Sequence, residues 1–415
     1  MKQALVIAPS DKHLSGTVEL DGSKSISNRA LIIQALCPEA IELTNLSESD
    51  DTNVLVHALT HKPEVIDVGA AGTTLRFLCA WLSTQPGTYV LTGSQRMTER
   101  PVGILVEALR TLGANIEYLG NPGYPPLKIT GTSIEGGEIF IAANISSQFL
   151  SALLMVAPVF KQGLTLNLLT PLVSEPYLNM TLRLMKYFGV NHQKSGQSLY
   201  IPPQKYIARP FEIEADWSAA SYFFALAALS DSADLLLPKL YAQSLQGDSV
   251  IQELMSWFGV FTRQETDGIR LIKTTSVLPD VFHYNFIKCP DIAQTMAVLC
   301  AALRVPANMK GLSTLKIKET DRTAALQTEL KKVNARFTST KNSGTLTFPK
   351  KTHNHPTPIA FDTYHDHRMA MSFAILTMVE PSGVVINNPE VVSKSFPGFW
   401  NTLRRLDFQV QVRDL

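Results

Sequence analysis

The sequence predicts a mixed α/β (α+β) protein with two lobes, built from six repeated units of helices and strands. Three observations lead to this prediction. The chain has 415 residues, more than one ordinary core holds, which favours two or three domains. Hydrophobic residues make up 45% of it and charged residues 18%, as in a well-packed globular protein. A helix-ending pattern also recurs five times at nearly even intervals.

The recurring pattern is an apolar helix end followed by Gly, Asn or Asp. Its copies are Leu109 to Gly113, Met185 to Gly189, Met255 to Gly259, Leu330 to Asn334 and Leu403 to Asp407. Gly, Asn and Asp best tolerate the left-handed conformation in which many helices end. Successive stops lie 70 to 76 residues apart, an interval longer than solenoid repeats.

Strand-like alternating sequence follows the helix stops and is interrupted by turn signals. The turn signals are Asn121-Pro-Gly, Ser195-Gly, Asp267-Gly and Asn342-Ser-Gly. The predicted unit is therefore helix, strand, hairpin, strand. The alternative is that this succession recurs by chance, as it can in any α/β protein.

Five visible units and a less regular one before residue 70 make six, or three in each lobe. The joints are expected near Leu20 to Gly22 and near Glu214. Residues 1–20 together with 215–415 then form lobe I, and residues 21–214 form lobe II.

Composition excludes several classes of protein. Lys and Arg number 37 against 36 Asp and Glu, a formal charge of +1, so the global basic field of a nucleic-acid-binding protein is missing. The longest apolar runs, Ser151 to Phe160 and Ala219 to Leu229, are too short to cross a bilayer. The N-terminal apolar run is too brief for a signal peptide. We expect a cytoplasmic monomer with no nucleic-acid or membrane partner.

The four cysteines lie singly in apolar surroundings, without C-x-x-C or metal-ligand spacing; they are Cys37, Cys79, Cys289 and Cys300. They are expected to be buried free thiols, and no metal is expected.

Arginines follow capping residues at the openings of four apolar runs, in Ser27-Asn28-Arg29, Thr73-Thr74-Leu75-Arg76, Thr320-Asp321-Arg322 and Asp366-His367-Arg368. Cations are unfavourable at a helix N-terminus, where the dipole is positive. A bound anion explains them, because free N–H groups, hydroxyls and an Arg fork together form a phosphate or carboxylate site. The alternative for each is a surface Arg paired with a carboxylate such as Asp321 or Asp366.

Other segments support an anion site between the lobes. The small residues of Ala70-Ala71-Gly72 allow backbone N–H groups to approach a ligand closely. Lys316 to Arg322 concentrates charges before a helix, where pKa values shift, although a solvated charge run is equally possible. Asp291, after Pro290, fits a catalytic base or an N-cap, and local sequence favours the cap. No nucleophile triad, H-E-x-x-H motif or nucleotide-binding glycine loop is found.

Several motifs make the chain resemble the 5-enolpyruvylshikimate-3-phosphate synthases, also called 3-phosphoshikimate 1-carboxyvinyltransferases. The motifs run in order from residue 16 to about residue 398. They are Gly22-Ser-Lys-Ser-Ile-Ser-Asn-Arg-Ala-Leu31, Ala71-Gly-Thr-Thr-Leu-Arg76, Leu91-Thr-Gly93, Arg96-Met-Thr-Glu-Arg-Pro101, Ser146-Ser-Gln-Phe-Leu-Ser-Ala-Leu-Leu-Met155, Lys318-Glu-Thr-Asp-Arg322 and Asp366-His-Arg-Met-Ala-Met371.

The resemblance implies a two-lobed inside-out α/β barrel with three βαβαββ units in each lobe, which close on the substrates. It places shikimate 3-phosphate against Lys24, Ser25, Arg29, Ser146, Ser147, Gln148, Ser174, Asp291 and Lys318, with Tyr177 nearby. It places phosphoenolpyruvate against Lys24, Gly72, Arg100, Gln148, Arg322, Arg368 and Lys394. Arg29 would meet the shikimate carboxylate, and Arg76 has no assigned ligand.

The implied reaction belongs to aromatic amino-acid biosynthesis and proceeds by addition and then elimination. The 5-hydroxyl attacks C2 of phosphoenolpyruvate while the methylene takes a proton, then phosphate leaves and the proton is removed. The resemblance assigns Asp291 as the base and Glu319 as the acid, while Lys24 and Lys318 stabilise charge. No cofactor or metal is implied.

Three positions depart from the family pattern. Ala70 and Thr314 stand where Asn is usual, and Glu175 stands where Lys is usual beside the phosphate-binding Ser174. These changes predict weaker phosphate binding with the acid and base residues intact.

Two alternatives remain. The related transferase acting on UDP-N-acetylglucosamine typically has a reactive Cys in a mobile loop, and none of the four Cys lies in such a loop. A non-catalytic anion-binding or RNA-end-binding protein of the same fold would lose Asp291 or Glu319, and both are present.

Overall fold

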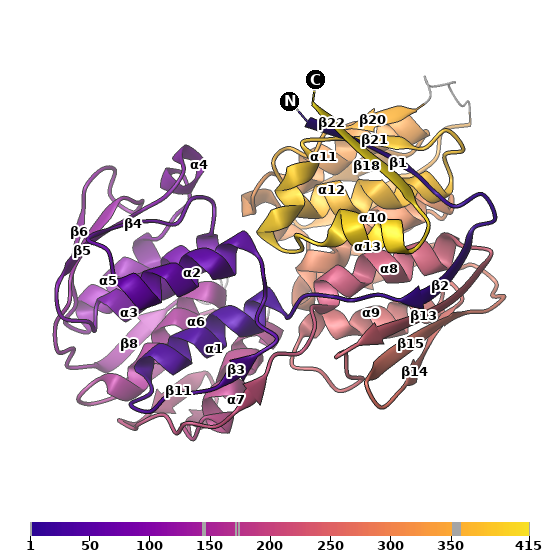
Figure 1. Ribbon diagram of the computed structural model, residues 1–415. Coiled ribbons are helices and arrows are strands. Elements are labelled where there is room, and N and C mark those ends of the chain that lie inside the picture. The colour runs from indigo at the N-terminus through magenta and orange to yellow at the C-terminus, as the bar shows by residue number, and fades with distance from the viewer. Residues whose placement is uncertain (1, 143–146, 171, 173–174, 351–357, 415) are drawn as a thin grey trace. The chain divides into compact units, whose positions relative to one another are not determined.

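A computed structural model describes residues 2–142, 147–170, 172, 175–350 and 358–414 of the chain. It divides into two compact units (Figure 1). Unit 1 comprises Met1–Asp21 and Glu214–Leu415, and unit 2 comprises Gly22–Ile213. The mixed α/β class predicted from the sequence is confirmed.

Unit 2 contains three of the sheets found in the described residues. One has the strand order β4 (Val65–Asp67), β5 (Thr88–Thr92), β7 (Leu127–Thr130), β6 (Asn115–Tyr118). The second has the order β10 (Gln193–Ser195), β11 (Ser198–Ile201), β9 (Leu164–Leu168), β8 (Gly137–Ile141). The third is a parallel pair of β3 (Leu43–Thr44) and β12 (Phe211–Glu212), the reduced form of the irregular unit expected before residue 70.

The helices of unit 2 pack chiefly against one another. They are α1 (Lys24–Leu36), α2 (Asp50–His61), α3 (Gly72–Leu82), α4 (Gln95–Thr98), α5 (Gly103–Thr111), α6 (Ser147–Val156) and α7 (Glu175–Tyr187). Helix α3 contacts α2, α5 and α6, and α6 contacts α7. Nearly every residue of α3 and α6 is buried, as expected of helices that are apolar on all sides.

Unit 1 repeats this arrangement with three four-stranded sheets in its described residues. The first has the order β14 (Val260–Gln264), β15 (Gly268–Lys273), β13 (Ser232–Pro238), β2 (His13–Thr17). The second has the order β16 (Phe282–Asn285), β17 (Ala307–Lys310), β19 (Ser343–Thr347), β18 (Arg336–Ser339). The third has the order β20 (Ile359–Phe361), β21 (Val384–Asn387), β1 (Lys2–Ile7), β22 (Gln409–Asp414).

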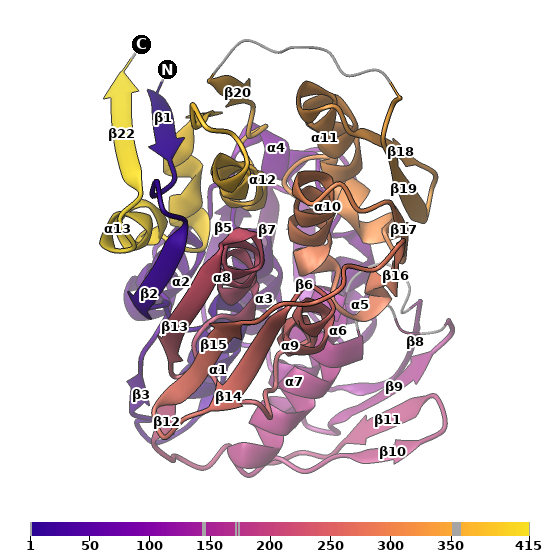
Figure 2. The same ribbon diagram turned by 90° about the vertical axis from the view of Figure 1, so that its right-hand side faces the viewer.

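Figure 2 shows α8, α10 and α12 of unit 1 surrounded by the strands of these sheets. The helices of this unit are α8 (Trp217–Leu229), α9 (Ile251–Ser256), α10 (Ala293–Ala302), α11 (Arg322–Glu329), α12 (His367–Ala374) and α13 (Phe399–Arg405). All residues of α8 and α12 are buried. A helix enclosed in this way meets water only at its ends, so its termini are the places where polar side chains gather.

The βαβαββ order is seen in the run β16, α10, β17, α11, β18, β19. In this unit β16 and β17 are parallel, and β18 and β19 form an antiparallel hairpin whose strand β19 pairs with β17. In the last repeat the N-terminal strand β1 supplies the hairpin partner of β22. The chain therefore closes its final sheet with its own first strand.

All five predicted helix stops adopt the left-handed conformation. Their φ angles are 105° at Gly113, 88° at Gly189, 78° at Gly259, 54° at Asn334 and 63° at Asp407. After four of the stops, the next amide donates to the carbonyl five residues earlier, as in a Schellman motif. The predicted helix stops are thus confirmed, and their cause is the left-handed backbone conformation that Gly, Asn and Asp tolerate.

Three of the cysteines are buried free thiols as predicted, whereas Cys37 is only partly buried. Burial raises the pKa of Cys79 to about 12, so this thiol is unreactive. In the described part of the chain, we find no helix long and apolar enough to span a bilayer.

The helix stops give a prediction about stability. Gly189 and Gly123 have nearly equal φ angles of 88° and 89°, but a Cβ at Gly189 meets Ile207 at 2.6 Å, while at Gly123 it meets nothing within 4 Å. Gly123→Ala should therefore cost only backbone strain, about 1 to 2 kcal/mol. Gly189→Ala should lower the free energy of unfolding by about 1 kcal/mol more, because the added methyl overpacks against Ile207. Urea unfolding of both variants measures the difference, and equal losses would show that Ile207 moves aside freely.

Candidate active site

The polar run before Leu31 forms the start of α1, one turn earlier than expected. Ser23 is the N-cap residue and Lys24 the first helical residue. Ser27 and Asn28 are therefore not caps but buried helix residues, which bond the segment that leads into α2: Ser27 Oγ accepts from the amide of Ser47, and Asn28 Oδ1 accepts from Thr52 Oγ1. The cation in the first turn is Lys24.

Lys24 makes an ion pair with Asp51, at 3.1 Å between Nζ and Oδ2. Both side chains are largely buried. Asp51 lies in the first turn of α2, behind the N-cap Ser49. Sequence reasoning missed it, because acidic residues are ordinary in a first helical turn.

Arg29 is buried at the centre of unit 2, with 2% of its surface exposed. Its guanidinium donates to Thr181 Oγ1 at 2.7 Å, Ser151 Oγ at 3.0 Å and the carbonyl of Ser25 at 2.8 Å. These three acceptors are all neutral, and burial lowers the pKa of Arg29 to about 10. A buried cation with neutral partners favours an incoming anion. The Tyr177 ring lies 5.9 Å away from it.

Gly72 lies directly beneath the Arg100 guanidinium. A Cβ at Gly72 would stand 2.6 Å from Arg100 Nη1. Arg100 Nε is buried and has no hydrogen-bond partner among the described residues. The lack of a side chain at position 72 thus makes room for Arg100 at the start of α3.

Arg76 was expected in the first turn of a helix, but α3 begins at Gly72, with Ala71 as its N-cap residue. Arg76 therefore lies in the second turn. It donates to the carbonyls of Gly72 at 2.7 Å and Pro101 at 3.2 Å. This tie holds the Arg100 segment against the helix start, which is the structural role left open for it by the sequence.

The remaining predicted residues of unit 2 lie on α6 and α7. Gln148 Nε2 donates to Thr73 Oγ1 at 3.0 Å, which links α6 to the start of α3. Ser147 is the first residue of α6 and is buried. Two predicted ligands, Ser146 and Ser174, lie outside the described residues.

Unit 1 gathers three carboxylates and four cations at the starts of helices. The carboxylates are Asp291, Glu319 and Asp366, and the cations are Lys318, Arg322, Arg368 and Lys394. They come from four places in the chain: the 3-10 turn Pro290–Ile292, the start of α11, the start of α12 and the 3-10 turn Pro389–Lys394.

Arg322 is the centre of this cluster. Its Nε donates to Asp366 at 2.8 Å, one Nη donates to Glu319 at 3.0 Å and the other to Asp291 at 3.2 Å. Burial opposes the charge, but the three carboxylates outweigh it and raise the pKa of Arg322. Asp366 is fully buried and also caps α12 through the amide of Arg368.

Asp291 does not cap a helix, so the N-cap expected from local sequence is wrong. Helix α10 begins two residues later, with Ile292 as its N-cap residue. The carboxylate instead contacts Lys318 and Arg322, each at 3.2 Å, and Arg368 at 3.3 Å. Burial alone would raise the pKa of Asp291, but the three cations hold it well below its ordinary value. Asp291 is thus an ionised hydrogen-bond acceptor.

Glu319 has a cation on each oxygen. Lys394 Nζ lies 3.3 Å from Oε1, and Arg322 lies 3.0 Å from Oε2. Lys394 and Glu319 are both largely buried. The cluster thus combines fixed positive charge with two carboxylates in the interior, as acid-base chemistry on an anionic substrate requires. In the described part of the chain, no group of three or more His, Cys, Asp or Glu side chains is placed to hold a metal ion.

Comparison with known proteins decides between the families that share this chemistry. The family model for EPSP synthase (3-phosphoshikimate 1-carboxyvinyltransferase) matches residues 9–61 and 59–403. The chain belongs to the EPSP synthase family. The prediction from the sequence motifs is confirmed.

Relatives with this activity align over nearly the whole chain. A 3-phosphoshikimate 1-carboxyvinyltransferase of Bacteroides fragilis (strain YCH46) is 48% identical over 409 residues, covering 98% of each chain. One from Sulfurovum sp. (strain NBC37-1) is 37% identical over 424 residues, covering 95% of this chain and 97% of its own. A solved EPSP synthase structure from Acinetobacter baumannii has a TM-score of 0.79 at 22% identity and covers both chains fully, so it shares the fold.

All three departures from the EPSP synthase pattern lie in the described residues. Thr314 Oγ1 is buried and has no hydrogen-bond partner among the described residues. Glu175 is the first residue of α7, where an acid suits the helix dipole. Ala70 lies in the turn before α3.

Two N-cap aspartates of unit 1, Asp321 and Asp366, provide a matched test of the Arg322 cluster. Asp321 caps α11 through the amide of Ala324, and its removal in Asp321→Ala should cost about 1 kcal/mol. Asp366→Ala also breaks a buried ion pair and leaves Arg322 Nε without its acceptor, so we expect a loss of about 3 to 5 kcal/mol. Urea unfolding measures both values. Equal losses would mean that Asp366 matters only as a cap.

Proposed function

We propose that this chain is a 3-phosphoshikimate 1-carboxyvinyltransferase, which transfers the enolpyruvyl group of phosphoenolpyruvate to the 5-hydroxyl of shikimate 3-phosphate and releases phosphate. The observation that carries the proposal is the cluster around Arg322, in which Asp291 and Glu319 pair with four cations and Arg322 contacts both. Family membership supplies the substrates, and the cluster supplies the acid-base chemistry.

Unit 2 supplies most of the residues assigned to shikimate 3-phosphate, and Asp291 and Lys318 of unit 1 complete the set. The substrate carboxylate pairs with Arg29, whose present acceptors are neutral. The other groups of unit 2 assigned to this substrate are Lys24, Ser25, Ser147 and Gln148, with Tyr177 nearby. Ser146 and Ser174 are assigned to it from the sequence motifs alone, because they lie outside the described residues.

Phosphoenolpyruvate is assigned to residues of both units. Arg322 and Arg368 bind its carboxylate, while Arg100 and Lys24 bind its phosphate. Gly72 and Gln148 line the phosphate side, and Lys394 balances charge beside Glu319.

Asp291 acts as the base that takes the proton of the 5-hydroxyl. In the described structure three cations stabilise its ionised form, which makes it a weak base. When the phosphoenolpyruvate carboxylate pairs with Arg322 and Arg368, their hold on Asp291 weakens and its basicity rises. Substrate binding thereby switches the base on, with Lys318 left to orient it together with the shikimate hydroxyl.

Glu319 acts on the methylene carbon. Glu319, paired with Arg322 and Lys394 in the free site, takes up a proton from solvent when the substrate carboxylate replaces it on Arg322. As the oxygen attacks C2, the carboxyl gives this proton to C3 and forms a methyl group; Lys394, 3.3 Å from Oε1, stabilises the carboxylate that results. In the second step Glu319 takes a methyl proton back, the double bond re-forms and phosphate leaves. One group thus serves as acid and then as base.

The surroundings of the reaction are also part of the proposal. We infer a cytoplasmic enzyme that works as a monomer without a cofactor, since the acid, the base and the fixed charges all come from its own side chains. Unit 2 corresponds to the predicted lobe II and is assigned to the shikimate side.

The test is phosphate release by the purified protein. We expect release only when shikimate 3-phosphate and phosphoenolpyruvate are both present. UDP-N-acetylglucosamine in place of shikimate 3-phosphate should give none. Asp291→Asn should lower kcat by about 10² to 10⁴, the range for loss of a general base. Activity with the sugar nucleotide, or near-normal turnover of the variant, would contradict the acceptor or the base assignment, respectively.

Gly72→Ala tests the phosphate side. The added methyl displaces the Arg100 guanidinium, because a Cβ at position 72 would lie 2.6 Å from Arg100 Nη1, closer than two non-bonded heavy atoms can approach. Loss of a charged hydrogen bond, about 1.5 to 3 kcal/mol, should raise the KM for phosphoenolpyruvate roughly 10- to 100-fold. Gly398→Ala is the control, since a Cβ there meets its nearest atom at 3.4 Å. Unchanged KM in Gly72→Ala would remove Arg100 from the site.

A further inference from the structure

Asp248 is a buried carboxyl group that the reaction described above does not use. It lies in the 3-10 turn Gly247–Val250, which packs against α8 and α9, and only 3% of its surface is exposed. Oδ2 accepts a short hydrogen bond from Ser218 Oγ. Oδ1 is buried and has no hydrogen-bond partner among the described residues.

The backbone around Asp248 is held rigidly to the start of α8. Gln246 Oε1 accepts from the amide of Trp217 at 3.0 Å, and Gln246 Nε2 donates to Glu214 at 3.0 Å and to the carbonyl of Ala215 at 2.8 Å. The Trp217 indole donates to the same glutamate at 2.8 Å. These bonds fix Gln246, two residues before Asp248, to the start of α8, and Ser218 in the first turn of α8 bonds Asp248 itself.

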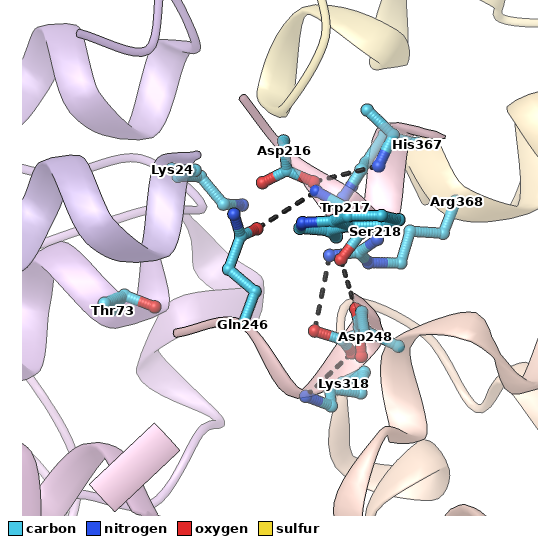
Figure 3. A network of polar contacts seen from close by, with 12 residues as sticks. Lys24, Thr73, Asp216, Trp217, Ser218, Gln246, Asp248, Lys318, His367 and Arg368 are labelled. Atoms are coloured by element: carbon cyan, nitrogen blue, oxygen red, sulfur yellow. Dashed lines mark hydrogen bonds and ion pairs between the residues drawn. The ribbon is translucent and has the colours of Figure 1, made fainter. Parts of the chain in front are cut away.

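Two of the groups that act on Asp248 belong to the proposed active site: Asp291 from the turn before α10 and Arg368 from α12. The others are Asp216, the N-cap residue of α8, and Ser218 in its first turn. Cys289 in the turn before α10 also interacts with Asp248, and the nearest acid of α9, Glu253, acts on Tyr284. Figure 3 shows Ser218 directed at Asp248, with Arg368 and Lys318 in the same network.

The charge of Asp248 determines the sign of the cluster. The cluster around Arg322 has three carboxylates and four cations, and Asp216, which also acts on Arg368, adds a fourth negative charge. A fifth carboxylate beside Arg368 would make the cluster negative and oppose an anionic substrate. A neutral acid there would leave Arg368 available.

We propose that Asp248 is a positioning residue whose charge tunes the hold of Arg368 on the carboxylate of the enolpyruvyl donor. The inference rests on the proposed function for the identity of the anion. Neutral Asp248 lets Arg368 bind the anion, and ionised Asp248 competes for Arg368.

The environment of Asp248 places this change near neutral pH. Burial and the nearby Asp291 raise the pKa of Asp248 to about 7, against the opposing effects of Arg368 and Ser218. The carboxyl is therefore neutral below this pH and ionised above it. The KM for phosphoenolpyruvate should rise as pH increases through 7. By linkage, binding of the anion should raise the pKa of Asp248 further.

The first experiment observes the carboxyl itself. Carboxyl ¹³C NMR of the protein with labelled aspartate, compared with Asp248→Asn to identify the signal, follows its titration. We expect a midpoint about three pH units above that of an ordinary aspartate, near pH 7. Ser218→Ala should move the midpoint higher still, because it removes a hydrogen bond to the ionised form. Titration of Asp248 below pH 5 would overturn the proposal.

The second experiment compares KM for phosphoenolpyruvate in the wild type and Asp248→Asn at pH 6 and pH 8.5. The substrate phosphate titrates equally for both proteins, so the ratio of the two KM values isolates Asp248. We expect the ratio of wild type to variant to increase about fivefold between these pH values, with a smaller change in kcat. A ratio independent of pH would show that Asp248 acts through packing alone, which contradicts the proposal.

Two controls separate the possible failures. Asp231→Asn removes an exposed carboxylate of the same unit, and its KM should follow the wild type at every pH. Absence of phosphate release by the wild type would refute the proposed function, whereas the NMR titration would still decide the charge of Asp248. If Asp248→Asn does not fold, Ser218→Ala shifts the pH midpoint of KM and provides the same comparison.

Discussion

The buried Arg322 guanidinium is the interaction on which unit 1 depends. It joins the start of α11 to the cap of α12 and to the turn before α10 through three carboxylates. Each of these groups would be costly to bury alone, since an unpaired interior charge destabilises a fold by several kcal/mol, roughly. Together they are stable, and the hydrogen bonds from Arg322 fix the positions of the Asp291 and Glu319 carboxylates. The active-site geometry is thus fixed by the same contacts that stabilise the helix starts.

Burial of entire helices explains why the polar groups gather where they do. Helices α8 and α12 are buried along their whole length, so their ends are the places where free amide groups and charges are tolerated. The same holds for α3 in unit 2, where Gly72 and Arg100 meet. Sheets on the outside and helices on the inside therefore produce several anion-binding helix starts from one repeated unit.

The sequence predicts the parts of this structure that depend on local chemistry. The five left-handed helix stops are correct because Gly, Asn and Asp tolerate those backbone angles best. The helix starts at Arg29 and Arg76 were placed one turn too late, because Ser23 and Ala71 precede these helices without a side-chain cap bond that would mark them. Asp51 and Asp248 could not be found from the sequence, since a single acid near a helix start has no distinguishing pattern. Their roles arise from partners far away in the chain.

Strong ion pairs in the described structure stabilise the ionised form of Asp291 and so lower its strength as a base. The proposed function resolves this conflict, because an anionic substrate would take over two of the three cations on Asp291. The free energy of that exchange is small, since one carboxylate replaces another. In this proposal the base gains proton affinity only after the substrate has bound. The ion pairs of the free site therefore keep Asp291 a weak base until the substrate binds. This arrangement requires a cluster whose net charge stays close to zero.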